Sequence, residues 1–260
     1  MSAAVSTLSY STPSAPGWLH RALRHRSFVI GAVLSALLIL AALLSFVWTP
    51  WSPYEMDLAN KLASPSGTHW LGTDAFGRDV ASLLLVGARN SILVGVIAVG
   101  IGLTIGTALG LLAAAKRGWV EELIMRLADF TFAFPAILSA IMMTAVFGAG
   151  IVNSIIAIGI FNIPTFARVT RASANAVWSR EYILASRACG KGSWRITLEH
   201  VLPNILSVLI VQATIQFAIA ILAEAALSYL GLGTQPPQPS WGRMLSEAQT
   251  LMFQAPLLSL

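Results

Sequence analysis

The sequence predicts an all-α integral membrane protein with five membrane-spanning helices. Hydrophobic residues make up 56% of its 260 residues and charged residues only 10%, whereas about a quarter of the residues in a soluble domain are charged. The apolar residues gather in segments close to the roughly twenty residues that a hydrocarbon core demands. Because a backbone in lipid must satisfy its own hydrogen bonds, we expect these segments to be helices.

The composition argues against nucleic-acid binding and against a metal site. The net charge is +5, but the sequence has no basic stripe with interleaved aromatic residues, and the basic loops of a membrane protein explain the excess. The single cysteine, Cys189, excludes an intrachain disulfide. The four histidines are scattered and lack metal-ligand spacing, so no metal or cofactor is expected on this chain.

The first part of the chain is predicted to hold a tail, one span and an external segment. Residues 1–27 are small, polar and basic, which favours a disordered cytoplasmic tail. Residues 28–47 carry no charge and are long enough to cross the bilayer. A signal peptide would have a shorter apolar core and a small-residue cleavage site, which is not seen here. Residues 48–89 are mixed and charged, and we expect them outside the membrane.

The remaining residues, 90–260, are predicted to form one transmembrane domain. We expect its spans at about 92–115, 128–147, 151–167 and 201–223. Within the first of these four, the glycines Gly102, Gly106 and Gly110 recur on one helix face and predict close helix packing.

Four further residues qualify these spans. Pro135 lies near the start of segment 128–147 and predicts a kink or a first helical turn. Asn162 and Pro164 are expected to break segment 151–167. Glu224 ends the last span, and a carboxylate there predicts either interhelical pairing or a position at an extracellular gate, with even weight.

The distribution of basic residues predicts the orientation. With the amino terminus in the cytoplasm, twelve Lys and Arg residues lie inside and four lie outside. Because basic residues near span ends are retained in the cytoplasm, this orientation is preferred. The loop 168–200 is then cytoplasmic and the loop 224–250 external, and Arg168 and Arg171 read as interfacial anchors rather than solute ligands.

The cytoplasmic loop is predicted to hold two helices that meet at a glycine turn. The stretch from Phe166 to Ala188 has helical composition, and Gly190 and Gly192 interrupt it. A second short helix is expected to begin at Ser193, whose hydroxyl can cap it. Two such helices at a membrane surface are typical of docking into a groove of a soluble partner.

Three motifs resemble one transporter family. The run EYILASRACG with SWRITLEHVLPN resembles the cytoplasmic signature loop of permease subunits in bacterial ATP-binding-cassette importers, in the dipeptide, oligopeptide and nickel branch and of the C type of the permease pair. The stretches HWLGTDAFGRDVASLLLVGARNS and EAALSYLGLGTQPPQPSWGRML look like two further segments of that family. The resemblance covers about residues 28–258 and implies the type I importer transmembrane fold, usually with six spans.

The resemblance assigns roles in ATPase coupling to a set of loop residues. These are Glu181, Tyr182, Ala185, Ser186, Arg187, Gly190, Trp194, Arg195, Leu202 and Pro203. Two positions depart from the general pattern, because Leu184 stands where it has Glu and His200 where it has Ile. The family's sixth span is not found before Leu260, so either the chain is truncated or that helix is absent.

The resemblance also implies the function and the partners. The chain would form half of the pore of a peptide importer in the bacterial inner membrane, in a heterodimer with a homologous second permease. Its other partners would be two cytoplasmic ATP-binding subunits that hold ATP and Mg, and an extracytoplasmic solute-binding protein. The chain lacks a phosphate-binding loop of its own, so we do not expect it to be an enzyme. Import of nickel or another small solute is the alternative, and an ion-coupled secondary transporter is a weaker one because the spans carry no midplane carboxylate.

Overall fold

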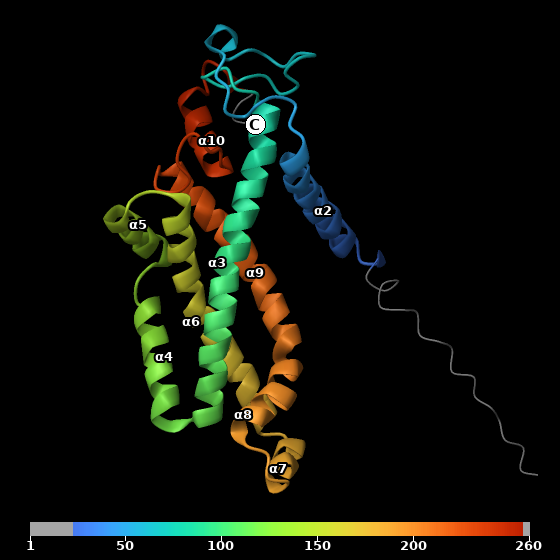
Figure 1. The fold of residues 1–260 in the computed structure, drawn as a ribbon, viewed down its shortest axis with the longest axis vertical. Coiled ribbons are helices and arrows are strands. Elements are labelled where there is room, and N and C mark those ends of the chain that lie inside the picture. The colour runs from blue at the N-terminus through green and yellow to red at the C-terminus, as the bar shows by residue number, and fades with distance from the viewer. Residues whose placement is uncertain (1–22, 257–260) are drawn as a thin grey trace, which may run out of the picture. The chain divides into compact units, whose positions relative to one another are not determined.

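The computed structural model describes residues 23–256, and helices joined by loops make up this part of the chain (Figure 1). Residues 1–22 of the predicted tail 1–27 lie outside the described residues, and its last two residues, Arg26 and Ser27, already belong to the helix that begins at Arg26. The elements in chain order are α2 (Arg26–Val47), η1 (Leu58–Asn60), α3 (Val80–Lys116), α4 (Gly118–Phe132), α5 (Ala136–Phe147), α6 (Ile151–Trp178), α7 (Glu181–Ala188), α8 (Ser193–Ile196), η2 (Thr197–Val201), α9 (Leu202–Tyr229) and α10 (Trp241–Thr250).

Four helical stretches of the described residues are long and apolar enough to cross a membrane. They are α2, α3, α6 and the run Ser193–Tyr229, which joins α8, η2 and α9. The helices α4 and α5 qualify only as a pair, and the pair is bent by 83°. The structure therefore has four candidate spans, or five if the bent pair crosses the membrane once, where the sequence predicted five.

Helix α3 begins twelve residues before the predicted span 92–115, because Asp79 caps it. The Asp79 carboxylate accepts a hydrogen bond from the Ser82 amide at 2.8 Å and one from the Ser82 hydroxyl at 2.8 Å. These bonds satisfy groups that a helix start leaves unpaired. At 37 residues, α3 is about 55 Å long, so it extends beyond the roughly 30 Å hydrocarbon core.

Helix α6 is continuous through the two residues that were expected to break it. It runs from Ile151 to Trp178, with Pro164 inside it. That expectation was wrong because both Asn162 and Pro164 are buried within the bundle, and neighbouring helices and local adjustments can accommodate a proline in a membrane helix. The cytoplasmic loop predicted at 168–200 therefore begins with the last three turns of α6.

The residues between the predicted spans 92–115 and 128–147 are mostly helical and form the end of α3 and most of α4. Two acidic residues of α4 pair with α6, where Arg171 Nη1 donates to Glu121 Oε1 at 2.8 Å and Arg168 pairs with Asp129. The apolar stretch 128–147 is divided by a break that ends at Pro135, which precedes the first residue of α5. Proline fits the start of a helix but interrupts its interior, which explains the break.

The core of the bundle lies where α3, α6 and α9 pack together. Its fully buried side chains include Val94 of α3, Phe166 of α6 and Ile205 of α9. Helix α9 extends to Tyr229, beyond the predicted end at 223. The predicted external loop 224–250 also contains α10, which Ser240 caps by accepting a hydrogen bond from the Arg243 amide at 3.3 Å.

Candidate coupling element and external cluster

Helices α7 and α8 form a compact element at one end of the bundle (Figure 1), which we call the coupling element, residues 181–200. Two fully buried isoleucines anchor it, Ile183 of α7 and Ile196 of α8. The Arg187 guanidinium lies over the ring of Trp178, the last residue of α6, at 4.9 Å from the ring centroid. The element is therefore packed onto the bundle and can pass a movement to it.

Gly190 makes the turn between the two helices with a left-handed backbone. Its φ is +80°, and a Cβ placed there would meet nothing within 4 Å. Its amide donates to the Arg187 carbonyl at 2.9 Å, which closes α7. Gly192 has φ −69° and the same open surroundings, so only Gly190 of the two requires glycine for its backbone angle.

Polar contacts hold the turn against η2, the element that precedes α9. The ammonium of Lys191 donates to Glu199 Oε2 at 2.7 Å and lies 3.2 Å from His200 Nε2. The His200 ring meets the ring of Tyr182 edge-on, with centroids 6.2 Å apart. His200, one of the two departures from the family pattern, thus has a defined contact within the element.

The predicted coupling residues lie on the surface or the partly buried flanks of the element, and none of them is buried. Ser186 donates its hydroxyl to the Tyr182 carbonyl, the Ala185 carbonyl accepts the Cys189 amide, and Leu202 and Pro203 begin α9. Glu181 begins α7 and Arg195 pairs with Glu199 on the outside of α8. The exposed apolar residues are Tyr182 at 44%, Leu184 at 58%, Trp194 at 67% and Leu198 at 46%.

The glycines Gly102, Gly106 and Gly110 all face α6. A Cβ on them would lie 2.3 Å from the Asn162 Cβ, 2.5 Å from the Ile163 carbonyl oxygen and 2.5 Å from the Ala167 carbonyl oxygen, respectively. Real Cβ atoms do not approach other atoms so closely. The two helices can therefore lie at this separation only because these positions lack side chains.

Glu224 is buried and is held by hydroxyl groups rather than by a basic residue. Its carboxylate accepts hydrogen bonds from Ser228 at 2.7 Å, Ser91 at 3.1 Å and Thr234 at 3.2 Å. These partners belong to α9, to α3 and to the segment after α9. Of the two predicted roles, this geometry fits interhelical pairing.

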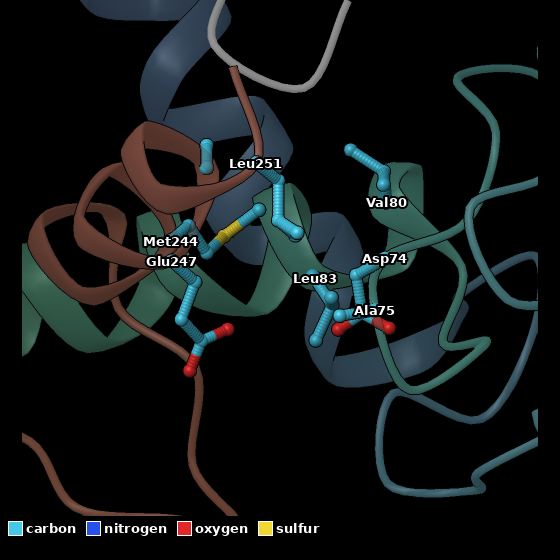
Figure 2. Close-up of a pocket in the computed structure, with 8 residues that line it drawn as sticks. Asp74, Ala75, Val80, Leu83, Met244, Glu247 and Leu251 are labelled. Atoms are coloured by element: carbon cyan, nitrogen blue, oxygen red, sulfur yellow. The ribbon is translucent and has the colours of Figure 1, made fainter. Parts of the chain in front are cut away.

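A second polar cluster lies where α10 meets α3, at the end of the bundle opposite the coupling element (Figure 1). Arg78 pairs with Asp74 at 2.6 Å and with Glu247 of α10 at 3.3 Å. Figure 2 shows Asp74 from the segment before α3 and Glu247 from α10 around a small pocket that is also lined by Leu83 and Met244. Arg78 is only 8% exposed, so a buried guanidinium links the segment before α3 to α10.

Two buried amides, Asn162 and Gln216, form a polar pair that the sequence did not predict. The Gln216 side chain donates to Asn162 Oδ1 at 2.7 Å across the space between α6 and α9. A polar residue within an apolar segment is the signal that could have drawn attention to each of them. Within residues 23–256 no group of three or more His, Cys, Asp or Glu residues is placed to hold a metal ion.

Comparison with known proteins supplies the family. The description "Binding-protein-dependent transport system inner membrane component" matches residues 106–260, and "N-terminal TM domain of oligopeptide transport permease C" matches residues 18–65. The dipeptide transport system permease protein DppC of Alkalihalophilus pseudofirmus is 42% identical over 233 residues, which are 90% of this chain and 77% of that protein. The glutathione transport system permease protein GsiD of Pectobacterium atrosepticum is 40% identical over 251 residues, which are 95% and 82%.

A solved structure supports the fold. The inward-facing MetNI methionine ABC transporter matches with a TM-score of 0.54 and 19% identity over 68% of this chain and 91% of that chain. At this identity the likeness concerns the fold alone. The family models and the curated relatives, with the several apolar spans, identify the chain as a multi-pass inner-membrane protein of the ABC importers, a member of the binding-protein-dependent transport system inner membrane components in the dipeptide and oligopeptide permease branch.

Proposed function

We propose that this chain is one permease subunit of an ATP-driven importer of dipeptides or short oligopeptides. The relatives named for dipeptide and glutathione transport, at 42% and 40% identity over most of the chain, support peptides over nickel. Family membership disfavours an ion-coupled secondary transporter, because the family's transport depends on a binding protein.

The observation that carries the proposal is the coupling element. It presents exposed apolar residues, among them Leu184 and Trp194, on helices that are anchored to the bundle by buried Ile183 and Ile196. An exposed apolar surface on short helices fits a groove in a soluble protein. The partner in this proposal is a cytoplasmic ATPase subunit, which holds the ATP and Mg and moves the pore by displacing this element.

The remaining assembly follows from the same proposal. A second, homologous permease completes the pore, a second ATPase subunit serves it, and an extracytoplasmic solute-binding protein delivers the peptide. The amino terminus lies in the cytoplasm, in keeping with the twelve basic residues assigned to that side. This places the coupling element in the cytoplasm and α10 with the external segment on the opposite side.

Uptake by the reconstituted complex tests the proposal. The two permeases and the ATPase subunits are placed in proteoliposomes with ATP inside and the loaded binding protein outside. We expect a labelled dipeptide to accumulate only with ATP, and labelled nickel not to accumulate. Nickel uptake without dipeptide uptake would contradict the peptide assignment.

A further inference from the structure

An apolar groove with a volume of about 380 Å³ opens between α5, α6 and α9. Its walls include Ile137 of α5, Ile158 of α6 and Ile219 of α9, and no charged residue lines it. The Asn162 and Gln216 amides and the Thr165 hydroxyl are its polar lining groups. Ligand sites commonly combine such apolar walls with a few placed polar groups, in volumes of about 300 to 1,000 Å³.

The Asn162 side chain lines this groove and has an unpaired amide nitrogen. Its Oδ1 accepts from Gln216 Nε2, but its Nδ2 is buried and has no partner. Asn162 is only 5% exposed. An amide nitrogen that is removed from water without an acceptor costs free energy, so an acceptor that reached Nδ2 from the groove would be stabilising.

The backbone of Asn162 has little room to move and so to give the unpaired amide nitrogen another partner. Gly102 of α3 lies so close behind it that a Cβ on Gly102 would be 2.3 Å from the Asn162 Cβ. Helix α3 therefore supports α6 at this residue, and the bond from Gln216 fixes the side chain. The amide is held in position, as a preorganised binding group should be.

Asn162 and Gln216 lie well inside the helices that carry them. Asn162 is about 17 Å along α6 from Ile151, and Gln216 about 20 Å along α9 from Tyr229, at about 1.5 Å per residue. Lipid tails offer no hydrogen-bond acceptor, so lipid is a poor occupant for a groove with an unpaired amide.

We propose that the Asn162 and Gln216 amides form a binding site for the main chain of a peptide in transit, where Asn162 Nδ2 donates to a peptide carbonyl oxygen. The inference rests on the proposed function and assigns it a contact within the permease. Carbonyl groups recur in every peptide, and the apolar walls hold no charge that would select one side chain. Neutral contacts also bind weakly enough for the solute to leave, which transport requires.

The experiment uses the full complex in proteoliposomes with saturating, loaded binding protein, and measures both dipeptide uptake and ATP hydrolysis. For Asn162→Leu we expect the dipeptides transported per ATP to fall about two- to tenfold, as for one neutral hydrogen bond. ATP hydrolysis should remain stimulated by the binding protein. Asn175→Leu is the matched control, because Asn175 is an α6 amide with a buried unpartnered oxygen that does not line the groove.

Equal transport per ATP by Asn162→Leu and the wild type would overturn the inference while the proposed function stands. Absence of uptake by the wild type itself would overturn the proposed function. Gln216→Leu is the second variant, and it should lower transport per ATP in the same way because it releases the Asn162 side chain.

A direct measurement covers the case in which these variants fail to fold. A dipeptide with a photoreactive diazirine side chain is irradiated during turnover of the wild-type complex, and the labelled residues are mapped by mass spectrometry. Labels on α6 and α9 near Asn162 and Gln216 that excess dipeptide suppresses support the site. Labels found only elsewhere would overturn the site. It would also be overturned if an Ile219→Cys variant crosslinked to the second permease throughout turnover, because the groove would then be covered by that subunit.

Discussion

A Cβ at Gly106 of α3 would lie 2.5 Å from the carbonyl oxygen of Ile163 in α6. The main chains of the two helices are therefore nearly in contact at this point. The same approach occurs at Gly102 and Gly110, so one glycine face sets the separation of the pair along several turns.

Gly106→Ala should destabilise the bundle, because the added methyl group forces α3 and α6 apart. We expect a loss of about 1–3 kcal/mol in the free energy of unfolding, as for other overpacked cores. Gly100→Ala is the matched control, since Gly100 also lies in α3 and a Cβ there meets nothing within 4 Å. Thermal unfolding in detergent checks both, and an equal melting temperature for the two variants would contradict the packing account.

Gly190→Val should leave the protein inserted in the membrane but weaken the coupling of ATP hydrolysis to transport. A β-branched residue at φ +80° is strained by about 1–3 kcal/mol, so the turn is expected to rearrange. Gly192→Val is the control, because Gly192 has an ordinary φ of −69° and open space around it. The ratio of dipeptides transported to ATP hydrolysed should fall for the first variant only.

Trp194→Ala should weaken binding of the ATPase subunit. Its indole is 67% exposed on α8, and a tryptophan that becomes buried at an interface often contributes 2 kcal/mol or more, which is roughly thirtyfold in affinity. Trp119 of α4 is 74% exposed but lies outside the coupling element. Co-purification of the ATPase subunit at increasing dilution should fall for Trp194→Ala and stay near the wild type for Trp119→Ala.

Glu224→Leu should destabilise the junction between α3, α9 and the segment that follows α9. Each of the three hydroxyls that donate to this carboxylate would lose its acceptor, at roughly 1–3 kcal/mol for each one left unsatisfied. Glu224→Gln keeps one acceptor oxygen and should be milder. Thermal unfolding and limited proteolysis of residues 231–240 measure the effect, and a stable Glu224→Leu protein with a protected segment would count against this role.

The sequence predicted the glycine face of α3 and the turn at Gly190 because both depend on local or periodic patterns. The glycine face of α3 follows the helical repeat, and Gly190 follows a helical stretch at the place where a turn must come. The starts of α3 and α10 were missed although Asp79 and Ser240 are ordinary capping residues before an apolar or helical run. The capping residues therefore carry a sequence signal for both helix starts.

Other features could not be read from the sequence because they depend on packing between distant segments. Pro164 was expected to break its helix, but the close approach of α3 and the burial of Pro164 keep α6 continuous. Asn162 and Gln216 lie on different helices, and only the fold brings their amides to 2.7 Å. The ion pairs between α4 and α6 could not be predicted either, because Arg168 and Arg171 lie far along the chain from Asp129 and Glu121.

The central claim is that residues 181–200 dock onto a cytoplasmic ATPase subunit, and the native cysteine gives the most direct test. Cys189 is the single cysteine of the sequence and is exposed beside Gly190. It is labelled with a maleimide benzophenone in the purified chain, the complex is assembled and irradiated, and the products are identified by mass spectrometry. We predict a covalent product with the ATPase subunit, and products formed only with lipid, the second permease or the binding protein would contradict the account.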